Sequence, residues 1–597
     1  MSIIVSCARG HNSSTTLMID GEIIFYLEEE RLTRLKYDGS PLIGLTKVFD
    51  YVDHIDDLVI CHTHEFGADL DWCGGDPYSG IVRKLARKKF TFNVHHINEI
   101  HHEMHASAAF YNSGFETAAI LVADGAGSFL KVGECPDVAY EFESIFKAKY
   151  PCKIQQVYKH LGTKAAIGCV HLEDQEGGNV WLTEYPGHTK MYEAVTEYCG
   201  WEAIEAGKTM GLAPYGKPND EIPSFFTEDG WGNRDLIIPT YPSAARLNIG
   251  RYPKLFKEDL KKRREGEYTD LQKDLAYKIQ EQSSDRMCDL IQKTVDLTGE
   301  KNICISGGYG LNCVANYKYW ERFPDLNIYC EPISHDGGTS VGGAYYIHYN
   351  ETGDRTPRTR TSVYYGPQYD PKSYEDQIKD LELKDVTYDD VAALIREGNI
   401  VTIFQGKSEG GPRALGNRSI LFDPTIKDGK DIVNKVKHRE WFRPFACSIK
   451  EEKVHEWFDL KGRDKSPFMM YAVRCHEGIE EKIPSVIHVD GTCRIQTVTE
   501  EENKHYYNLI DAFEKITDVP ILFNTSFNLG GDPLVETIED ALDTLNRSDI
   551  EYMYLPEIGK LVKVPNDGID KSNNIQNDVK SNMKNIYGKS RKIKFMK

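Results

Sequence analysis

The sequence contains fourteen cysteines but no two of them in the spacing C-x-x-C. That absence excludes zinc-ribbon and thioredoxin-type sites, because both are built on such pairs. The cysteines are instead typical of reduced, mostly buried thiols in a cytosolic protein. A chain of 597 residues is too long for one hydrophobic core, so we expect two or three domains.

Long apolar runs and an excess of positive charge are also missing. No apolar stretch approaches eighteen residues, which predicts no transmembrane helix, and the N-terminus lacks the basic and apolar regions of a signal peptide. The formal net charge of −20 excludes broad, non-specific binding to nucleic acid or anionic membrane, but it allows a local basic pocket. We therefore expect a cytoplasmic enzyme that does not bind membranes.

Two histidines one helical turn apart are the first candidates for chemistry. If residues 101–111 form a helix, His101 and His105 lie about 6 Å apart and can reach one metal ion. The apolar run 118–123 predicts a buried strand that presents Asp124 at its C-terminal end, where open α/β sheets bind ligands. Two imidazoles and a carboxylate suit a divalent transition metal. Clustered histidines also decorate ordinary surface helices, so this pattern alone leaves both interpretations open.

Short strands open the chain. Residues 3–7, 15–19 and 22–27 predict strands, and Asp20-Gly21 predicts a hairpin turn between the last two. The charged segment 28–34 that follows predicts a helix.

Two glycine-rich turns occur further along the N-terminal part. Residues 302–306 predict a buried strand, and the turn 307–312 follows it before a helix. Glycines allow close backbone approach to a ligand, and amides at a helix N-terminus favour anions. The second turn precedes a small-residue helix at 340–346 and offers Asp336 as a second carboxylate to the same metal, with His335 as a competing ligand.

Residues 351–362 contain nothing strongly apolar and predict a linker or exposed loop, where we place the main domain boundary. Beyond it, a helix at 389–395 and a buried strand at 400–404 lead into the loop 405–421. We expect this loop to join a strand to a helix and to bind an anion, because guanidinium groups and free amides both suit phosphate.

More cations follow that loop, at Lys437, Arg439 and Arg443. Arg443 stands between aromatic residues and proline, a setting that calls for an anionic partner. Residues 566–597 are predicted to be weakly ordered, and their basic tip either touches a nucleic-acid phosphate or is merely solvated.

Seven motifs occur in order along the chain: Gly-His-Asn-Ser (10–13), His-His-Glu-Met-His-Ala (101–106), Gly-Gly-Tyr-Gly-Leu-Asn (307–312), Glu-Gly-Gly-Pro-Arg-Ala-Leu-Gly-Asn-Arg-Ser-Ile-Leu (409–421), Phe-Arg-Pro-Phe-Ala (442–446), Asp-Gly-Thr-Cys-Arg-Ile-Gln-Thr-Val (490–498) and Asn-Thr-Ser-Phe-Asn (524–528). Together they resemble the ATP-dependent O-carbamoyltransferases that carbamoylate nodulation factors, cephalosporins and tobramycin. The resemblance covers roughly residues 1–565.

This resemblance implies an α/β protein with two folded parts. Residues 1–355 would form a duplicated actin/hexokinase-like (ASKHA) domain, and residues 363–565 a YrdC-like α/β domain. The implied ligands of a divalent metal, iron or alternatively manganese, are His101, His105, Asp124 and Asp336. The implied nucleotide or carbamoyl-adenylate contacts of the first domain are Gly307, Gly308 and Asn312. The implied contacts for carbamoyl phosphate and ATP in the second domain are Arg413, Lys437, Arg443, Arg494, Asn524 and Ser526. Magnesium is a further ion that ATP could bring.

The implied activity has two halves. The C-terminal domain would make carbamoyl-adenylate from carbamoyl phosphate and ATP, and the N-terminal domain would transfer the carbamoyl group to an acceptor hydroxyl. The acceptor expected from the resemblance is a small molecule, such as a sugar, an antibiotic or another natural product. His11 matches the histidine of the family's acceptor-transfer loop, where it would act either as the general base or by shaping the pocket.

Other interpretations stay open at this point. The same chemistry could act on the hydroxymethyl group of a modified pyrimidine nucleotide or of DNA, and a metal- and ATP-binding regulator without catalysis would share the fold. Related tRNA-modification enzymes usually divide the two activities between chains. The hydrogenase-maturation carbamoyltransferase carries its YrdC-like part first and adds cysteine-pair zinc modules, which the absence of C-x-x-C excludes here. A homo-oligomer is compatible with each interpretation.

Overall fold

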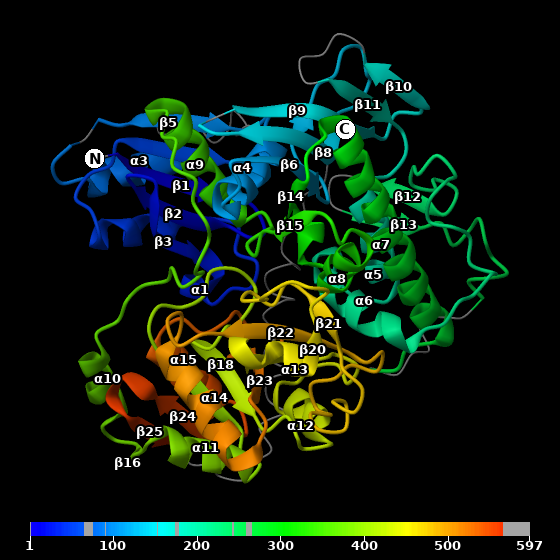
Figure 1. Cartoon of the computed structure of the whole chain (residues 1–597). Coiled ribbons are helices and arrows are strands. Elements are labelled where there is room, and N and C mark those ends of the chain that lie inside the picture. Colours follow the sequence, from blue (N-terminus) through cyan, green and yellow to red (C-terminus); the bar gives the residue numbers. More distant parts are fainter. Residues whose placement is uncertain are drawn as a thin grey trace, which may run out of the picture.

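A computed structural model of the chain describes residues 2–64, 76–89, 91–151, 153–172, 178–240, 244–257 and 266–564. The tail predicted at 566–597 lies outside these residues. Three large β-sheets organise the described part, and Figure 1 shows the elements of the C-terminal sheet lying below those of the two N-terminal sheets.

The first sheet has the strand order β3-β2-β1-β4-β5. Its strands are β1 (Ile3–Ala8), β2 (Ser14–Ile19), β3 (Glu22–Glu28), β4 (Asp57–Cys61) and β5 (Asn93–Ile97). β2 is antiparallel to both β1 and β3, whereas β4 is parallel to both β1 and β5. The three predicted strands and their hairpin are confirmed, because Asp20 and Gly21 have the φ angles of 48° and 82° that a tight two-residue turn requires.

The second sheet repeats this topology. β6 (Thr117–Ala123) takes the place of β1, because it is antiparallel to β8 (Ala139–Lys149) and parallel to β14 (Asn302–Ser306). β9 (Lys153–Thr163) and β15 (Asn327–Cys330) complete the order β9-β8-β6-β14-β15. The additional strands of this part are β7 (Phe129–Leu130), β10 (Cys169–Leu172), β11 (Asn179–Thr183), β12 (Ile237–Thr240) and β13 (Ala244–Leu247). The N-terminal part therefore contains two copies of one strand arrangement.

Two helices pack against both of these sheets. α4 (His101–Ser113) and α9 (Gly338–Thr352) approach so closely that a side chain on Gly342 would overlap the carbonyl oxygen of Met104. One hydrophobic cluster joins these helices to residues of the first and second sheets, among them Val59 and Val122. Both helices are buried along most of their length, as expected for helices enclosed on several sides. They confirm the helices predicted at 101–111 and 340–346.

The other helices of the N-terminal part lie around the two sheets. They are α1 (Glu29–Thr33), α2 (Leu42–Lys47), α3 (Pro77–Leu85), α5 (His188–Tyr198), α6 (Ala206–Leu212), α7 (Asp270–Thr298) and α8 (Cys313–Arg322). The helix predicted for the charged segment 28–34 is confirmed over Glu29–Thr33, while Glu28 ends β3. Between β14 and α8, the glycine turn forms a short 3-10 helix, η6 (Gly308–Leu311).

The third sheet contains ten strands in the order β16-β25-β24-β17-β18-β23-β19-β22-β21-β20. They are β16 (Glu382–Asp385), β17 (Val401–Phe404), β18 (Arg418–Phe422), β19 (Ala446–Lys450), β20 (Phe458–Asp459), β21 (Ala472–Cys475), β22 (Thr492–Val498), β23 (Ile521–Ser526), β24 (Tyr552–Leu555) and β25 (Lys560–Lys563). Its helices are α10 (Pro371–Ile378), α11 (Tyr388–Arg396), α12 (Gly429–Val436), α13 (Val454–Trp457), α14 (Lys504–Thr517) and α15 (Ile538–Asn546). The predicted helix at 389–395 and strand at 400–404 are confirmed.

The prediction that loop 405–421 joins a strand to a helix is wrong. The loop connects β17 to the antiparallel strand β18, which begins at Arg418. The guanidinium of Arg418 is fully buried and donates to the backbone carbonyls of Gln405 and Gly406. Arg418 thus connects the end of the loop to its beginning, and a local sequence pattern does not predict this contact.

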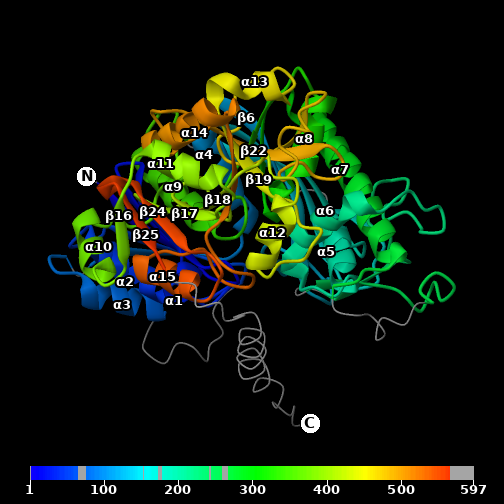
Figure 2. The same ribbon diagram turned by 90° about the horizontal axis from the view of Figure 1, so that it is seen from below.

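The C-terminal part contacts helices on both sides of the N-terminal part. The ring of Trp320 stacks on that of Tyr471 with centroids 3.7 Å apart, and Arg31 donates to the carbonyl oxygens of Glu409 and Gly411. Seen from below in Figure 2, α15 lies near α1 at one side and α12 lies near α5 and α6 at the other. Nine of the twelve described cysteines are buried and none forms a disulfide, which agrees with the predicted reduced thiols. Among the described helices, none is both long and apolar enough to cross a membrane.

The predicted linker is only partly exposed. Arg355 is solvent-exposed, but Arg360 is 5% exposed and lies 3.0 Å from the fully buried carboxylate of Glu331. Glu331 also accepts hydrogen bonds from the Tyr329 hydroxyl and the Ile333 amide. The expectation of an exposed loop therefore fails at Arg360, because a charge buried by tertiary contacts needs an opposite charge beside it.

We expect Arg360→Ala to destabilise the protein by about 3–5 kcal/mol, because it leaves the Glu331 carboxylate buried without its cation. Equilibrium denaturant unfolding of the two proteins measures this difference. Arg355→Ala is the matched control and should change the free energy of unfolding by less than about 0.5 kcal/mol, since it is exposed. Equal effects of the two substitutions would contradict the assignment.

Candidate functional site

Four side chains from separate elements meet at one point of the N-terminal part. His101 and His105 lie in the first turns of α4, Asp124 directly follows β6, and Asp336 precedes α9. One ligand atom from each residue lies within 4.8 Å of all the others. The structure thus brings together all four residues that the sequence analysis assigned to a metal.

The distances in this cluster fit a shared cation. Nε2 of His101 lies 3.1 Å from Nε2 of His105, 3.6 Å from Oδ2 of Asp124 and 3.7 Å from Oδ1 of Asp336. A tetrahedral ion with ligands at about 2.1 Å separates its ligand atoms by about 3.4 Å. Two imidazoles and two carboxylates are also a donor set that suits a divalent transition metal.

The charges of the cluster point the same way. Burial lowers the pKa of His101, but the carboxylates of Asp124 and Asp336 outweigh it and raise the pKa to about 10, so a bound metal would replace a proton on this imidazole. Burial likewise opposes ionisation of Asp336, yet His11, His101 and His105 hold its pKa well below the ordinary value. The carboxylates therefore stay ionised and place negative charge where a cation would lie.

The competing ligand His335 is turned away from this cluster. Its Nε2 lies 2.9 Å from Oε1 of Glu28, and its Nδ1 accepts a hydrogen bond from the Gly337 amide. Burial raises the pKa of Glu28, but His335 and Arg31 lower it to about 2, so the carboxylate remains charged beside the imidazole. His335 thereby stays bound to Glu28, and Asp336 faces the two other histidines.

The glycine turn after β14 holds Asp124. Gly307 has a φ of 84°, and a Cβ at this position would overlap the backbone of Ala123. The Gly308 amide donates to Oδ1 of Asp124 at 3.0 Å. Asn312 accepts from the Ala315 amide at the start of α8 and donates to Gln280. Gly308 and Asn312 are thus engaged within the protein, and the nucleotide contacts expected of Gly307, Gly308 and Asn312 stay a prediction.

His11 lies in the loop between β1 and β2, where its side chain is 54% exposed and Nδ1 is 3.7 Å from Oδ2 of Asp336. Beside it, α5 supplies a charged pair that the sequence analysis missed. Nζ of Lys190 lies 2.8 Å from Oε2 of Glu193, and the Glu193 carboxylate interacts electrostatically with both Asp124 and His11. A lysine and a glutamate three residues apart are common on exposed helix surfaces, so nothing in the sequence distinguishes this pair.

Five cationic side chains gather in the C-terminal part. Arg413 lies in the loop before β18, Lys437, Arg439 and Arg443 follow α12, and Arg494 lies in β22. Burial lowers the pKa of Arg413, and the charges of Arg494 and Arg443 lower it further, to about 9. Burial and the charges of Arg443, Arg494 and Arg413 also lower the pKa of Arg439. These side chains are therefore close enough to repel one another.

Acidic partners for these cations are scarce. In the described part of the chain, the ion pair made by the five side chains joins Arg443 to Glu440 at 3.6 Å. A cluster with this excess of positive charge calls for an anionic ligand, and several guanidinium groups together suit phosphate. Arg439 belongs to this cluster although the sequence analysis gave it no role; its position two residues after Lys437 was the available signal.

The two predicted polar residues of β23 lie beside these cations. Nζ of Lys437 donates to the carbonyl oxygens of Ser526 and, at 2.7 Å, of Asn528. Asn524 donates to the Ser448 hydroxyl at 2.9 Å, while its own Oδ1 is buried without a hydrogen-bond partner. The structure thus groups Arg413, Lys437, Arg443, Arg494, Asn524 and Ser526 as the sequence analysis expected.

One short segment touches both sites. Gly308, at the start of η6, donates to the candidate metal ligand Asp124. The carbonyl of Leu311, at its end, accepts from Nη2 of Arg413 at 3.2 Å. The candidate metal centre and the cation cluster are therefore neighbours, although they belong to different sheets.

Comparison with known proteins decides the family. The family model described as Carbamoyltransferase N-terminus matches residues 71–345, and the one described as Carbamoyltransferase C-terminus matches residues 392–560. Nodulation protein NolNO of Sinorhizobium fredii is 31% identical over 580 residues, which cover 91% of this chain and 77% of that protein. Nodulation protein NolO of Bradyrhizobium diazoefficiens is 32% identical over 475 residues, covering 76% of each chain. The chain belongs to the carbamoyltransferase family.

This membership confirms the resemblance drawn from the motifs and establishes an enzyme that transfers a carbamoyl group. A regulator without catalysis is thereby set aside. Within the carbamoyltransferase, the N-terminal family match contains the four clustered His and Asp residues and the C-terminal match contains the cation cluster, whereas His11 precedes both. Among solved structures, full-length HypF in its phosphate- and nucleotide-bound form covers 58% of this chain and 55% of its own, at 12% identity and a TM-score of 0.32.

We expect His101→Ala and His105→Ala to lose the bound metal, because each removes one of two imidazoles that face the same point. Elemental analysis of the purified proteins measures the metal content. His102→Asn is the matched control: His102 is equally buried in α4 but hydrogen-bonds Ser144, outside the cluster, and should keep the metal. Full metal occupancy in both alanine variants would refute the assignment.

We expect Arg439→Met to raise the Tm of the free enzyme and to weaken its binding of inorganic phosphate at least tenfold. The substitution relieves repulsion among the five cations and removes a charge that would pair with an anion, a contact of about 1.5–3 kcal/mol. Thermal unfolding and phosphate titration measure the two effects. Lys435→Met in the same region is exposed and should change neither quantity. A lower Tm with unchanged phosphate binding would show that Arg439 serves the fold alone.

Proposed function

We propose that this carbamoyltransferase makes carbamoyl-adenylate from carbamoyl phosphate and ATP and transfers the carbamoyl group to the hydroxyl of a small molecule. The observation that carries this proposal is the contact of one segment, η6, with both a cation cluster suited to phosphates and a His/Asp cluster suited to a metal. Carbamoyl-adenylate made at the cation cluster would therefore travel only a short distance to the His/Asp cluster. Direct transfer between neighbouring sites protects a reactive mixed anhydride from water.

The fold supports this division of labour. We propose that residues 1–355 form an actin/hexokinase-like domain, because its two sheets repeat the same strand order and direction. We propose that residues 363–565 form a YrdC-like domain around the ten-stranded sheet. Reduced thiols are the supporting observation for a cytoplasmic location.

The first half-reaction belongs to the cation cluster. Carbamoyl phosphate, ATP and one water would give carbamoyl-adenylate, phosphate and pyrophosphate, so apart from the water every substrate and every product is an anion. Arg413, Arg443 and Arg494 would bind the phosphate oxygens, and Arg439 would add a further charge as negative charge develops. Lys437 is held by the backbone carbonyls of Ser526 and Asn528, so it would present its charge from a defined position. Magnesium bound with ATP would complete the neutralisation.

The second half-reaction belongs to the N-terminal cluster. His101, His105, Asp124 and Asp336 would hold the divalent ion, iron or manganese. When bound, this ion supplies a Lewis acid that polarises oxygens of the adenylate. His11 would take the proton from the acceptor hydroxyl, and Asp336, 3.7 Å from its Nδ1, would stabilise the imidazolium that forms. The hydroxyl oxygen bonds to the carbamoyl carbon, the bond to the adenylate oxygen breaks, and AMP leaves.

Pyrophosphate and AMP release test the proposal directly. With ATP and labelled carbamoyl phosphate, the enzyme should form pyrophosphate only when both are present. A panel of hydroxylated sugars, antibiotics and hydroxymethyl-nucleotides should then contain at least one compound that takes up label with release of AMP. Pyrophosphate formation that does not depend on carbamoyl phosphate would contradict the adenylate route. Label found only on the hydroxymethyl-nucleotides would show that the acceptor is a nucleotide and not a sugar or an antibiotic.

His11→Ala should separate the two halves. We expect carbamoyl transfer to fall about 10²–10⁴-fold while pyrophosphate formation from carbamoyl phosphate and ATP continues, because His11 lies at the metal cluster and not among the cations. Single-turnover assays of both products measure this. Retained transfer would show that His11 only shapes the pocket.

A further inference from the structure

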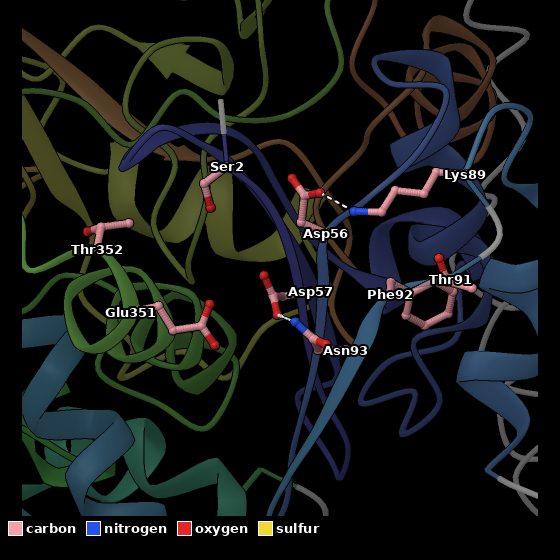
Figure 3. Close-up of a pocket in the computed structure, with 9 residues that line it drawn as sticks. All are labelled: Ser2, Asp56, Asp57, Lys89, Thr91, Phe92, Asn93, Glu351 and Thr352. Carbon is pink, nitrogen blue, oxygen red and sulfur yellow. Dashed lines mark hydrogen bonds and ion pairs between the residues drawn. The ribbon is translucent and has the colours of Figure 1, made fainter.

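A cavity of about 540 Å³ opens where strands β4 and β5 of the first sheet begin, whereas the metal cluster lies beyond the end at which β5 finishes. Asp57 and Asn93, the first residues of β4 and β5, line it together with Glu351 in the last turn of α9 (Figure 3). His101 follows the other end of β5, and a strand of five residues spans about 15 Å. This cavity is therefore separate from the site described above.

Three potential metal ligands meet beside this cavity. His95 lies two residues after Asn93 in β5, so both side chains are on the face of the sheet that also carries Asp57. Nε2 of His95 lies 2.9 Å from Oδ1 of Asp57 and 3.7 Å from Oε1 of Glu351. Ligand atoms of all three residues lie within 4.8 Å of one another. These separations bracket the value of about 3.4 Å found between ligands of a tetrahedral ion.

The charges around this point are unbalanced. Asp57 is 3% exposed, and Figure 3 shows the carboxylate of Glu351 extending toward that of Asp57, while Lys89 turns to Asp56. In the described part of the chain, the ion pairs of Asp57 and Glu351 are with His95 alone. Glu351 also lies at the C-terminal end of α9, where the helix dipole is negative and disfavours an acid. Two carboxylates and the negative end of a helix thus share one histidine, and this excess of negative charge favours binding of a cation.

We propose that Asp57, His95 and Glu351 bind a second divalent transition-metal ion. One imidazole and two carboxylates form a ligand set of the kind that holds Zn²⁺ or Mn²⁺, and the side-chain amide of Asn93 donates to Asp57 at 2.9 Å and orients it. The open cavity supplies room for the water ligands that complete the coordination. The ion joins the start of β4 and β5 to the end of α9. Since Asp336 stands just before the other end of this helix, the second ion braces the element that presents a ligand to the first.

Zinc binding by the full chain tests this proposal. After chelation and dialysis, titration with Zn²⁺ should show two sites in the wild type and one in either Glu351→Gln or His95→Asn. Combining Glu351→Gln with His101→Ala and His105→Ala should remove both. The Glu351 side chain is 45% exposed, so its glutamine variant should fold. Glu397→Gln is the matched control, because Glu397 is also an exposed glutamate at the C-terminal end of a helix.

The Tm provides a second readout that does not depend on activity. Zn²⁺ should raise the Tm of the His101→Ala/His105→Ala protein, and this increase should vanish when Glu351→Gln is added. An unchanged Zn²⁺ stoichiometry and affinity in both Glu351→Gln and His95→Asn would overturn the proposal. A single site in the wild type that His101→Ala abolishes would overturn it as well.

Discussion

A hydrogen bond from the backbone amide of Gly308 to Oδ1 of Asp124 joins the candidate metal centre to the turn that also contacts the cation cluster. It holds one oxygen of the carboxylate and leaves Oδ2 facing His101 at 3.6 Å. The same turn ends at Leu311, whose carbonyl accepts from Arg413. Because Gly307 has a positive φ and no space for a Cβ, another residue there would displace the turn. Both sites thus depend on one glycine turn at the end of β14.

An excess of charge of one sign occurs at two places in this enzyme. The cluster of Arg413, Arg439 and Arg443 has Glu440 as its acid, and the carboxylates of Asp57 and Glu351 have His95 as their base. Such arrangements cost stability in the free protein and are offset by the cores of three large sheets. The imbalance has opposite sign at the two places, so the ligands it calls for differ: phosphates at the first and a cation at the second. Buried charges that are balanced inside the protein, such as Arg360 with Glu331, serve the fold instead.

Local patterns predicted many elements well, because alternating or continuous apolar runs and turn residues act over short distances. The hairpin at Asp20-Gly21 and the helix carrying His101 are examples. The loop 405–421 was predicted wrongly, since a short apolar run after glycines does not reveal whether a strand or a helix follows. Its structure depends on Arg418, which reaches back to the carbonyls of Gln405 and Gly406. Arg360 was placed in an exposed linker for a similar reason: its ion-pair partner, Glu331, lies outside the segment from which the linker was predicted.

The sequence by itself determined the kinds of chemistry present, because residue types and motif order carry that information directly: a histidine pair with carboxylates, a glycine turn, and a run of cations. It also determined the family, through motifs spread over most of the chain. Only the tertiary structure decided which charges meet. Arg439 joins the cation cluster, His335 turns to Glu28 and away from Asp336, and Asp57 meets Glu351 across 294 positions of sequence. These pairings depend on how sheets and helices pack, and electrostatic contact acts through space and not along the chain.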